Sequence, residues 1–102
     1  MGKGKIIWSL SAKSKLFKIL EFYSARNKSK SYSVKLYGRF RTELAILLQQ
    51  PEIGVKTEIE NVRGFIIEHF IFFYEPQGEN IIIHTLWDSR QNPTDLKVKE
   101  DF

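Results

Sequence analysis

The stretch FIFFYEPQGENIIIHTLW, residues 70–87, contains two apolar runs that are rich in strand-forming residues. The runs cover residues 70–74 and 81–87, and the EPQGEN between them holds a proline and a glycine, which suit a hairpin turn. This stretch therefore predicts a β-hairpin. Its apolar strands would present a face that a second layer has to cover.

Two further strands are predicted outside the hairpin. One covers about residues 59–67, and a tight turn near Glu68 and His69 leads from it into the hairpin. The other is KIIWS, residues 5–9, which is β-branched and aromatic. Ser9 or Ser11 is expected to cap a helix that follows, because a serine hydroxyl can accept a hydrogen bond from a free N–H of the first turn.

The covering layer is predicted as two helices. The first helix carries an apolar stripe made of Leu16, Ile19, Leu20 and Tyr23. The second, from about Tyr32 to Gln50, carries a stripe made of Tyr37, Phe40, Leu44, Leu47 and Leu48, and Pro51 with Gly54 ends it. The short polar link RNKSKSYS, residues 26–33, indicates that the helices lie antiparallel.

These elements define an α+β fold class. The expected order is an N-terminal strand, an antiparallel helical hairpin and a three-stranded antiparallel meander, with the strands forming one sheet. A chain of 102 residues is enough for one core, so residues 1–102 are expected to form a single domain. The charged residues 94–102 are expected to form a loose tail.

The composition of the chain bears on its cellular location and on the kinds of site that it can hold. The chain has no cysteine, which excludes disulfides and fits a reducing cytosol. No apolar run is long enough to span a membrane, and the N-terminus lacks the apolar core of a signal peptide, so a cytoplasmic location without membrane contact is expected. No spacing of His, Asp and Glu suggests a metal site, and no cofactor is expected.

The net charge of +4 conceals an asymmetry between the two halves of the chain. Residues 1–50 carry 11 Lys and Arg against 2 Glu, whereas residues 51–102 carry 5 against 10 Asp and Glu. Such separation favours a basic surface for nucleic acid or for an acidic partner. The alternative is a lysine-rich helical face that is simply solvated.

Two arginines are candidates for partner binding. Arg63 stands beside Gly64 in a predicted strand, where a glycine indicates a bulge or a close backbone approach; its alternative role is an ion pair with Glu60. Arg90 follows the last strand in an exposed and anchored position, together with Trp87 and Asn92. The alternative for Arg90 is a surface pair with an aspartate, either Asp88 or Asp95, and such pairs contribute about 0 to 1 kcal/mol.

The two histidines are candidates for a general base, because imidazole titrates near neutral pH. His84 alternates with Ile82 and Leu86 and is expected on their face of the strand, so a histidine packed against the core is the alternative to a catalyst. His69 is expected to be an exposed turn residue.

The order and spacing of these segments resemble the RelE/ParE superfamily of toxins from bacterial type II toxin-antitoxin systems. The resemblance covers about residues 5–96 and includes IIWSLSAKSKLFKILEFY, YSVKLYGRFRTELAILLQQPEIG and VRGFIIEHFIFFYEPQGENIIIHTLWDSRQNP. It implies a toxin that inhibits growth, belongs to a system of the plasmid stabilisation type, and forms a hetero-oligomer with a cognate acidic antitoxin.

Within this superfamily the sequence is more similar to the ParE branch, because Arg63, Gly64, Phe65 and Tyr74 match the ParE pattern. RelE-like nucleases place basic groups at positions that Phe65, Ile66, Ile67 and the start of the next strand occupy here. The resemblance therefore implies binding to an essential target, with DNA gyrase nominated. Trp87 and Asp88 depart from the His and Gly common in ParE relatives, which puts the gyrase activity in question.

Two alternatives stay open. The chain could be a RelE-like, ribosome-dependent mRNA endonuclease, for which Arg63, His84 and Arg90 are the candidate catalytic residues. It could also be a degenerate relative that binds its antitoxin and is no longer toxic. Whether the protein is an enzyme is left undecided by its sequence.

Overall fold

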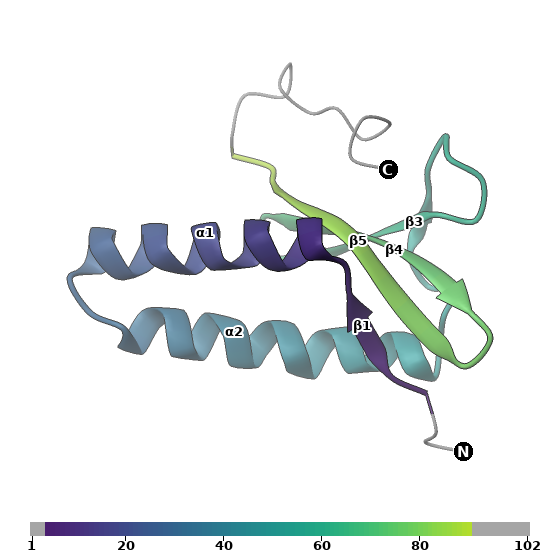
Figure 1. Ribbon diagram of the computed structural model, residues 1–102, viewed down its shortest axis with the longest axis horizontal. Coiled ribbons are helices and arrows are strands. Elements are labelled where there is room, and N and C mark those ends of the chain that lie inside the picture. The colour runs from purple at the N-terminus through teal and green to yellow at the C-terminus, as the bar shows by residue number, and fades with distance from the viewer. Residues whose placement is uncertain (1–3, 91–102) are drawn as a thin grey trace.

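A computed structural model describes residues 4–90. The elements in chain order are β1 (Ile6–Trp8), α1 (Leu10–Asn27), α2 (Ser31–Leu44), the 3-10 helix η1 (Ala45–Leu48), β2 (Val55–Lys56), β3 (Arg63–Ile67), β4 (Phe70–Gln77) and β5 (Asn80–Asp88). The predicted α+β fold of strand, helical hairpin and meander is confirmed (Figure 1). The predicted tail, residues 94–102, lies outside the described residues.

The strands form one sheet with the order β1-β5-β4-β3-β2. β1 runs parallel to β5, with Ile6 opposite Ile81, and the remaining pairs are antiparallel. The short strand β2 was not predicted. Two exposed residues carry no apolar alternation, so it is only the pairing of β2 with β3 that makes them a strand.

The strand predicted over residues 59–67 begins only at Arg63. A polar loop precedes it, because the Thr57 hydroxyl donates to the carbonyl of Val62 at 2.9 Å and accepts from the amide of Ile59 at 3.1 Å. Asn61 adopts a left-handed φ of 69° in the same loop. The tight turn near Glu68 is confirmed, with a φ of 55° at that residue.

The hairpin between β4 and β5 is tighter than predicted. β4 continues to Gln77 and β5 starts at Asn80, so Pro76 pairs with Ile81 inside the ladder instead of lying in the turn. Gly78, with a φ of 59°, supplies the left-handed residue that the turn requires.

The helices begin and end largely as expected. Ser9 is the N-cap of α1, and its side chain accepts a hydrogen bond from the amide of Ala12 at 3.0 Å. The second helix changes to a 3-10 helix after Leu44, short of the predicted end at Gln50. Its predicted stripe is wrong at one position, because Tyr37 is 38% exposed and Leu36 is buried in its place.

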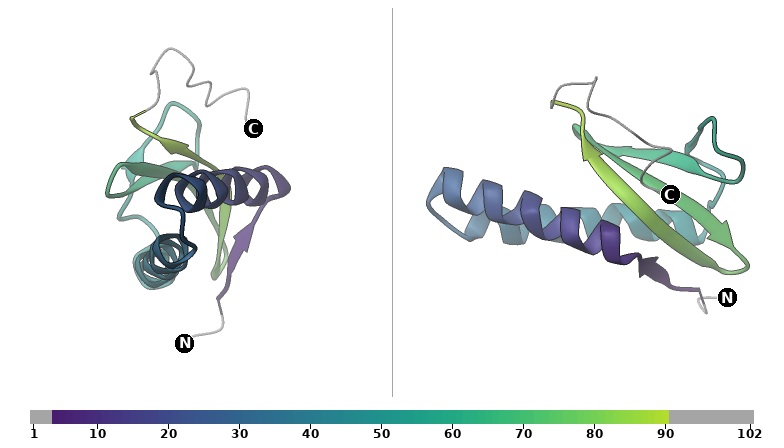
Figure 2. Two further views of the ribbon diagram at one scale, coloured as in Figure 1. Left: turned by 90° about the vertical axis from the view of Figure 1, so that its left-hand side faces the viewer. Right: turned by 45° about the horizontal axis from the view of Figure 1, so that its top comes forward.

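The core lies between the helical hairpin and one face of the sheet (Figure 2). Aromatic rings fill its centre: Phe40 of α2 packs edge-on against Phe70 at 5.1 Å and Phe72 at 4.9 Å between ring centroids. The other fully buried large side chains include Leu44, Leu47, Ile67, Tyr74, Ile81, Ile83 and Leu86. None of the helices among residues 4–90 is long and apolar enough to cross a membrane.

A β-bulge interrupts the pairing of β4 with β5. Phe73 pairs with Thr85 and Tyr74 pairs with Ile83, so His84 is an extra residue in β5. Because of this extra residue, Leu86 joins Ile83 in the core, and the expectation that His84 and Leu86 share one face is wrong.

Candidate functional site

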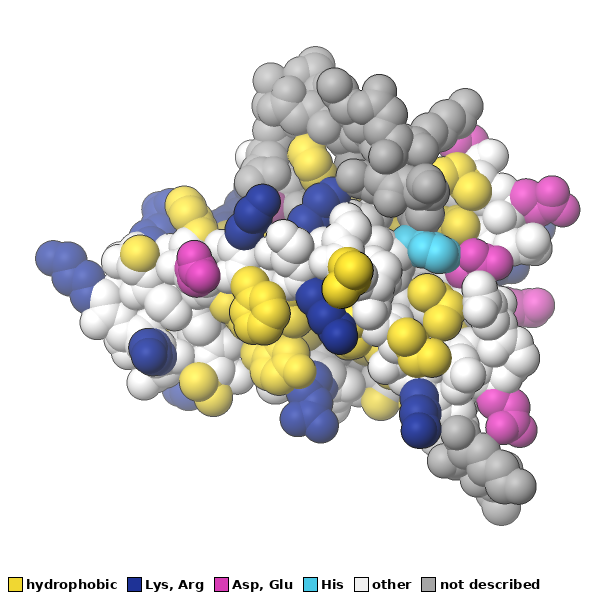
Figure 3. Space-filling view, viewed as in Figure 1, with side chains coloured by type: hydrophobic (Ala, Val, Ile, Leu, Met, Phe, Trp, Pro, Cys, Tyr) yellow, Lys and Arg dark blue, Asp and Glu magenta, His cyan; other side chains and the backbone are white. Residues whose placement is uncertain are grey.

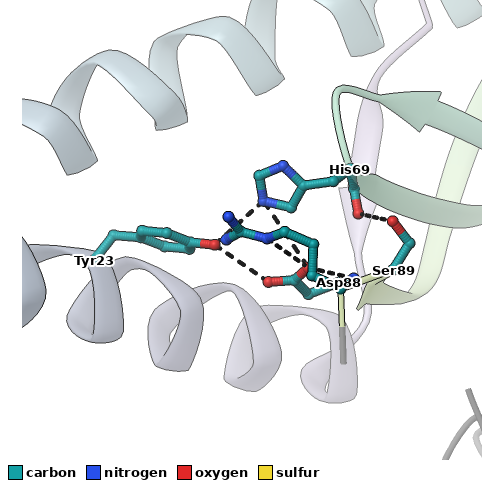
Figure 4. Close-up of polar contacts among 5 residues, drawn as sticks. Tyr23, His69, Asp88 and Ser89 are labelled. Carbon is teal, nitrogen blue, oxygen red and sulfur yellow. Dashed lines mark hydrogen bonds and ion pairs between the residues drawn. The ribbon is translucent and has the colours of Figure 1, made fainter. Parts of the chain in front are cut away.

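The candidate site lies where α1, the turn between β3 and β4, and the end of β5 meet. The hydroxyl of Tyr23 on α1 donates to a carboxylate oxygen of Asp88 at 3.2 Å and lies 3.2 Å from Nε2 of His69 (Figure 4). Tyr23 is 5% exposed and Asp88 is 9% exposed. The bulge at His84 makes this contact possible, because it turns Asp88 toward the helical layer together with Leu86.

Arg90 completes the cluster. Its backbone amide donates to Oδ1 of Asp88 at 2.9 Å, and its Nε lies 3.5 Å from the same oxygen. The guanidinium carbon stands 5.3 Å from the centre of the Tyr23 ring, within the range of a cation–π interaction. The side chain of Arg90 is nevertheless 54% exposed, so one side of the guanidinium remains open to a ligand.

The backbone beneath Arg90 is held by the preceding residue. Both the amide and the hydroxyl of Ser89 donate to the carbonyl oxygen of His69 at 2.7 Å (Figure 4). The end of β5 is therefore anchored on the turn between β3 and β4, and Arg90 starts from a well-defined position.

A cavity of about 470 Å³ opens beside this cluster. Its lining consists of Lys18, Ile19, Phe22, Tyr23, Arg26, Asp88 and Arg90. A second cavity of about 200 Å³ is lined by Lys15, Lys18, Ile19, Leu86, Trp87 and Asp88, so the two share part of their wall. Three cations against one carboxylate line the larger cavity, which suits an anionic ligand.

Arg63, the other predicted binding arginine, has a different environment. Its Nη1 donates to the carbonyl oxygens of Glu52 at 3.1 Å and Gly54 at 2.9 Å. Arg63 pairs with Tyr74 in the ladder, whereas Asp88 pairs with Phe70, which lies four residues before Tyr74 in β4. At about 3.3 Å per residue, Arg63 and the Asp88 cluster belong to separate parts of the sheet.

The third candidate, His84, is also separate from Arg90. Nε2 of His84 lies 2.9 Å from a carboxylate oxygen of Glu75, and its carbonyl accepts from the hydroxyl of Ser9 at 2.7 Å. The structure thus does not bring Arg63, His84 and Arg90 together. Trp87 lies near Arg90 as a half-buried side chain that lines the smaller cavity, and Asn92 lies outside the described residues.

Three members of the cluster were missed by sequence reasoning. Tyr23 was assigned to the core, His69 to an exposed turn, and Asp88 only to a surface pair with Arg90. The signal available in the sequence was the dipeptide Asp88-Ser89 directly before Arg90, because a carboxylate at a strand end needs a partner if it is buried. Residues 4–90 contain no group of His, Cys, Asp and Glu that could hold a metal ion.

A separate apolar groove lies between α1 and α2. It has a volume of about 750 Å³ and includes Phe17, Leu20, Val34 and Tyr37 in its walls, with Lys28 and Lys30 at the turn between the helices. Phe17 is 62% exposed and Val34 69% exposed. Figure 3 shows apolar side chains grouped over the helical hairpin with Lys and Arg around them, whereas most Asp and Glu lie over the far end of the sheet.

Comparison with known proteins identifies the class. The family model described as the ParE toxin of the type II toxin-antitoxin system parDE matches residues 6–93, and the chain belongs to this family. It is therefore a toxin-antitoxin toxin of the RelE/ParE superfamily, as its sequence indicated. No curated protein matches the chain.

Among solved structures, the fold is similar to a chain of the chromosomal ParDE toxin-antitoxin system from P. aeruginosa. The two share 18% sequence identity with a TM-score of 0.69, and the match covers 81% of this chain and 92% of that chain. At this identity the match shows a common fold.

Proposed function

We propose that this protein stops bacterial growth by binding an essential target, with DNA gyrase as the nominated target. The observation that supports binding over catalysis is the separation of the three residues that an RNA-cleaving site was expected to use. Arg63 is bound to backbone carbonyls, His84 is bound to Glu75, and Arg90 lies beyond β5 next to Tyr23. A metal-free cleavage site needs its base and its cations around one phosphate.

The partner proposed to neutralise the toxin is a cognate acidic antitoxin, acting in the cytosol as a hetero-oligomer with the chain. The groove between α1 and α2 offers it an apolar surface with exposed Phe17 and Val34, and Lys28 and Lys30 lie at the groove's end. An amphipathic acidic segment fits both properties. Val34→Asp should weaken antitoxin binding at least tenfold, while Val55→Asp, an exposed change on β2, should leave it unchanged.

The decisive experiment uses the purified chain in two parallel assays. In the first, gyrase and supercoiled DNA are incubated with the protein, and cleaved DNA or lost supercoiling is measured. In the second, translating ribosomes are incubated with it and mRNA ends are mapped. Gyrase inhibition without new mRNA ends supports the proposal, and codon-linked mRNA ends with normal gyrase activity would reject it.

A second candidate, mRNA cleavage, is favoured by one specific observation. His69 lies within hydrogen-bond distance of the Tyr23 hydroxyl, and the Arg90 guanidinium packs over the same tyrosine ring beside a cationic cavity. Such a group could exchange a proton and hold a phosphate. If His69→Gln abolishes mRNA cleavage while the fold is intact, this set replaces Arg63, His84 and Arg90 as the catalytic residues.

The third possibility, loss of toxicity, has its own result. Inducing the chain in bacteria without an antitoxin should arrest growth if either activity is present. Normal growth with the folded protein at high level would identify a degenerate relative that only binds its antitoxin.

A further inference from the structure

Three side chains form a row on one flank of α1. Lys18, Phe22 and Arg26 are spaced four residues apart, so they stand one above the other at intervals of about 6 Å along the helix. All three line the cavity that Arg90 closes from the side of β5. A cation, an aromatic ring and a second cation thus alternate along a single wall.

The row is open to solvent. Phe22 is 53% exposed, and Lys18 and Arg26 are exposed as well. Within residues 4–90, no hydrogen bond or ion pair holds the charged group of either Lys18 or Arg26. The Phe22 ring stands edge-on to Tyr23, with centroids 5.0 Å apart, so the buried tyrosine supports it from below.

The carboxylate in the cavity does not cancel this positive charge. Asp88 accepts hydrogen bonds from the Tyr23 hydroxyl and the Arg90 amide, and it lies 3.5 Å from the Arg90 guanidinium. Its charge is therefore offset within the cluster. Lys15 lines the adjoining cavity and donates to the Thr85 hydroxyl at 2.8 Å, which adds a further cation to the same flank.

We propose that this flank of α1 binds single-stranded nucleic acid. Lys18, Arg26 and Arg90 contact successive phosphates, and a base stacks on Phe22 between them. Alternating cations and aromatic rings are the features by which proteins hold single strands without reading their sequence. A duplex keeps its base faces stacked inside and has nothing to offer Phe22, whereas the amphipathic acidic segment proposed for the antitoxin is given the separate apolar groove between α1 and α2. The proposal does not depend on gyrase being the target of the toxin, and it uses the same cavity as the alternative of mRNA cleavage.

The first test measures how binding depends on salt. A fluorescein-labelled oligothymidylate is titrated with the purified full chain over a range of salt concentrations. The double variant Lys18→Gln/Arg26→Gln should bind less tightly, and the slope of log K against log salt should fall by roughly 1.4, since each lost phosphate contact with a single strand removes about 0.7. Lys13→Gln, on another flank of the same helix, is the matched control and should bind like wild type.

The second test measures stacking. Phe22→Ala should weaken binding of the single strand about tenfold, the effect expected for one stacked base, with an unchanged circular dichroism spectrum because the ring is largely exposed. A duplex of the same length should bind more weakly than the single strand. RNA and DNA oligonucleotides are compared to show which strand is preferred.

Three results would overturn the proposal. Equal losses in Lys13→Gln and the double variant would mean diffuse attraction to a basic surface. Wild-type affinity of the Phe22→Ala variant, together with equal binding of duplex and single strand, would show that no base stacks on Phe22. Displacement of the oligonucleotide by polyglutamate at equal charge concentration would assign the cavity to an acidic protein.

Discussion

The two ends of the central strands each carry an arginine beside a buried tyrosine, and the two arginines are used differently. At one end Arg63 donates to two backbone carbonyls of the loop that contains Gly54, next to the hydroxyl of Tyr74. At the other end Arg90 stands over Tyr23 with 54% of its side chain exposed to solvent.

This difference distinguishes an arginine that stabilises the fold from an arginine that is available to bind a partner. A guanidinium that binds the backbone carbonyls of a loop, as Arg63 does, leaves those acceptors without their donor when it is removed, and it has fewer N–H groups left for a ligand. A guanidinium that rests on a ring and a shared carboxylate contributes little to stability, and it can exchange those contacts for a phosphate or a partner's carboxylate. The comparison predicts that changes at the Arg63 end alter stability and that changes at the Arg90 end alter function.

The largest expected effect on stability is at Gly54. A Cβ at this position would lie 2.6 Å from the Tyr74 hydroxyl and 2.8 Å from the carbonyl oxygen of Gly64, so the loop has to move. Gly54→Ala should lower the free energy of unfolding by about 3 kcal/mol, measured by urea denaturation. The matched control is Gly38→Ala in α2, where nothing lies within 4 Å; a gain of about 0.5 to 1 kcal/mol is expected there.

The next effect concerns the Tyr74 hydroxyl, which accepts from the Gly54 amide at 2.9 Å and donates to the Pro51 carbonyl at 2.8 Å. Tyr74→Phe leaves both groups without this partner and should cost about 2 kcal/mol at neutral pH. A variant as stable as wild type would show that water replaces the hydroxyl.

The same variant has a pH signature. Burial raises the pKa of Tyr74, although the hydrogen bond from the Gly54 amide and the charge of Arg63 act in the opposite direction. Because the folded state favours the neutral phenol, its contribution is complete below the pKa of an exposed tyrosine, about 10, and is lost as the pH rises through the raised pKa. The stability gap between wild type and Tyr74→Phe should therefore narrow above about pH 10.

A smaller effect is expected for Arg63. Arg63→Gln should lower the free energy of unfolding by about 1 to 2 kcal/mol, because the carbonyls of Glu52 and Gly54 lose a charged donor. If this residue has no binding role, toxicity should fall only in proportion to the loss of folded protein. Loss of toxicity in an Arg63→Gln variant that is as stable as wild type would instead assign Arg63 a role in binding.

The smallest effect on stability is expected for Arg90. Arg90→Gln should change the free energy of unfolding by less than about 0.5 kcal/mol, because the Arg90 side chain is 54% exposed and buried Asp88 keeps its hydrogen bonds from the Tyr23 hydroxyl and the residue 90 amide. Growth arrest on induction should nevertheless weaken clearly. A folded Arg90→Gln variant that arrests growth as strongly as wild type would remove this residue from the functional surface.

Much of the fold could be predicted because local rules and packing agree. The Ser9 cap, the helical spacing of the α1 stripe and the left-handed turn at Gly78 each follow from residue types a few positions apart. The short strand β2 could not be predicted, because its two exposed residues are a strand only through their partner β3. Tyr37 was misplaced because an aromatic residue near the edge of a helical stripe fits either face.

The site was harder to predict, because its members meet only after the chain has folded. Arg90 could be selected because it follows the end of a strand, but Tyr23 contacts Asp88 across 65 residues of sequence and His69 across 46. The bulge at His84 decides which face Asp88 takes, and a strictly alternating strand gives the opposite answer. The single extra residue in β5 therefore turns Asp88 toward Tyr23, a contact that strict alternation does not predict.

The parallel pairing of β1 with β5 has a consequence for biosynthesis. Ile6 pairs with Ile81, and the Ser9 amide and hydroxyl bond to carbonyls of Ile83 and His84. Contacts so distant along the chain are slow to form and require that β5 has already been translated. During synthesis β1 therefore stays unpaired until β5 has emerged from the ribosome. The side of the cavity that Arg90 contributes opposite α1 forms only after that step.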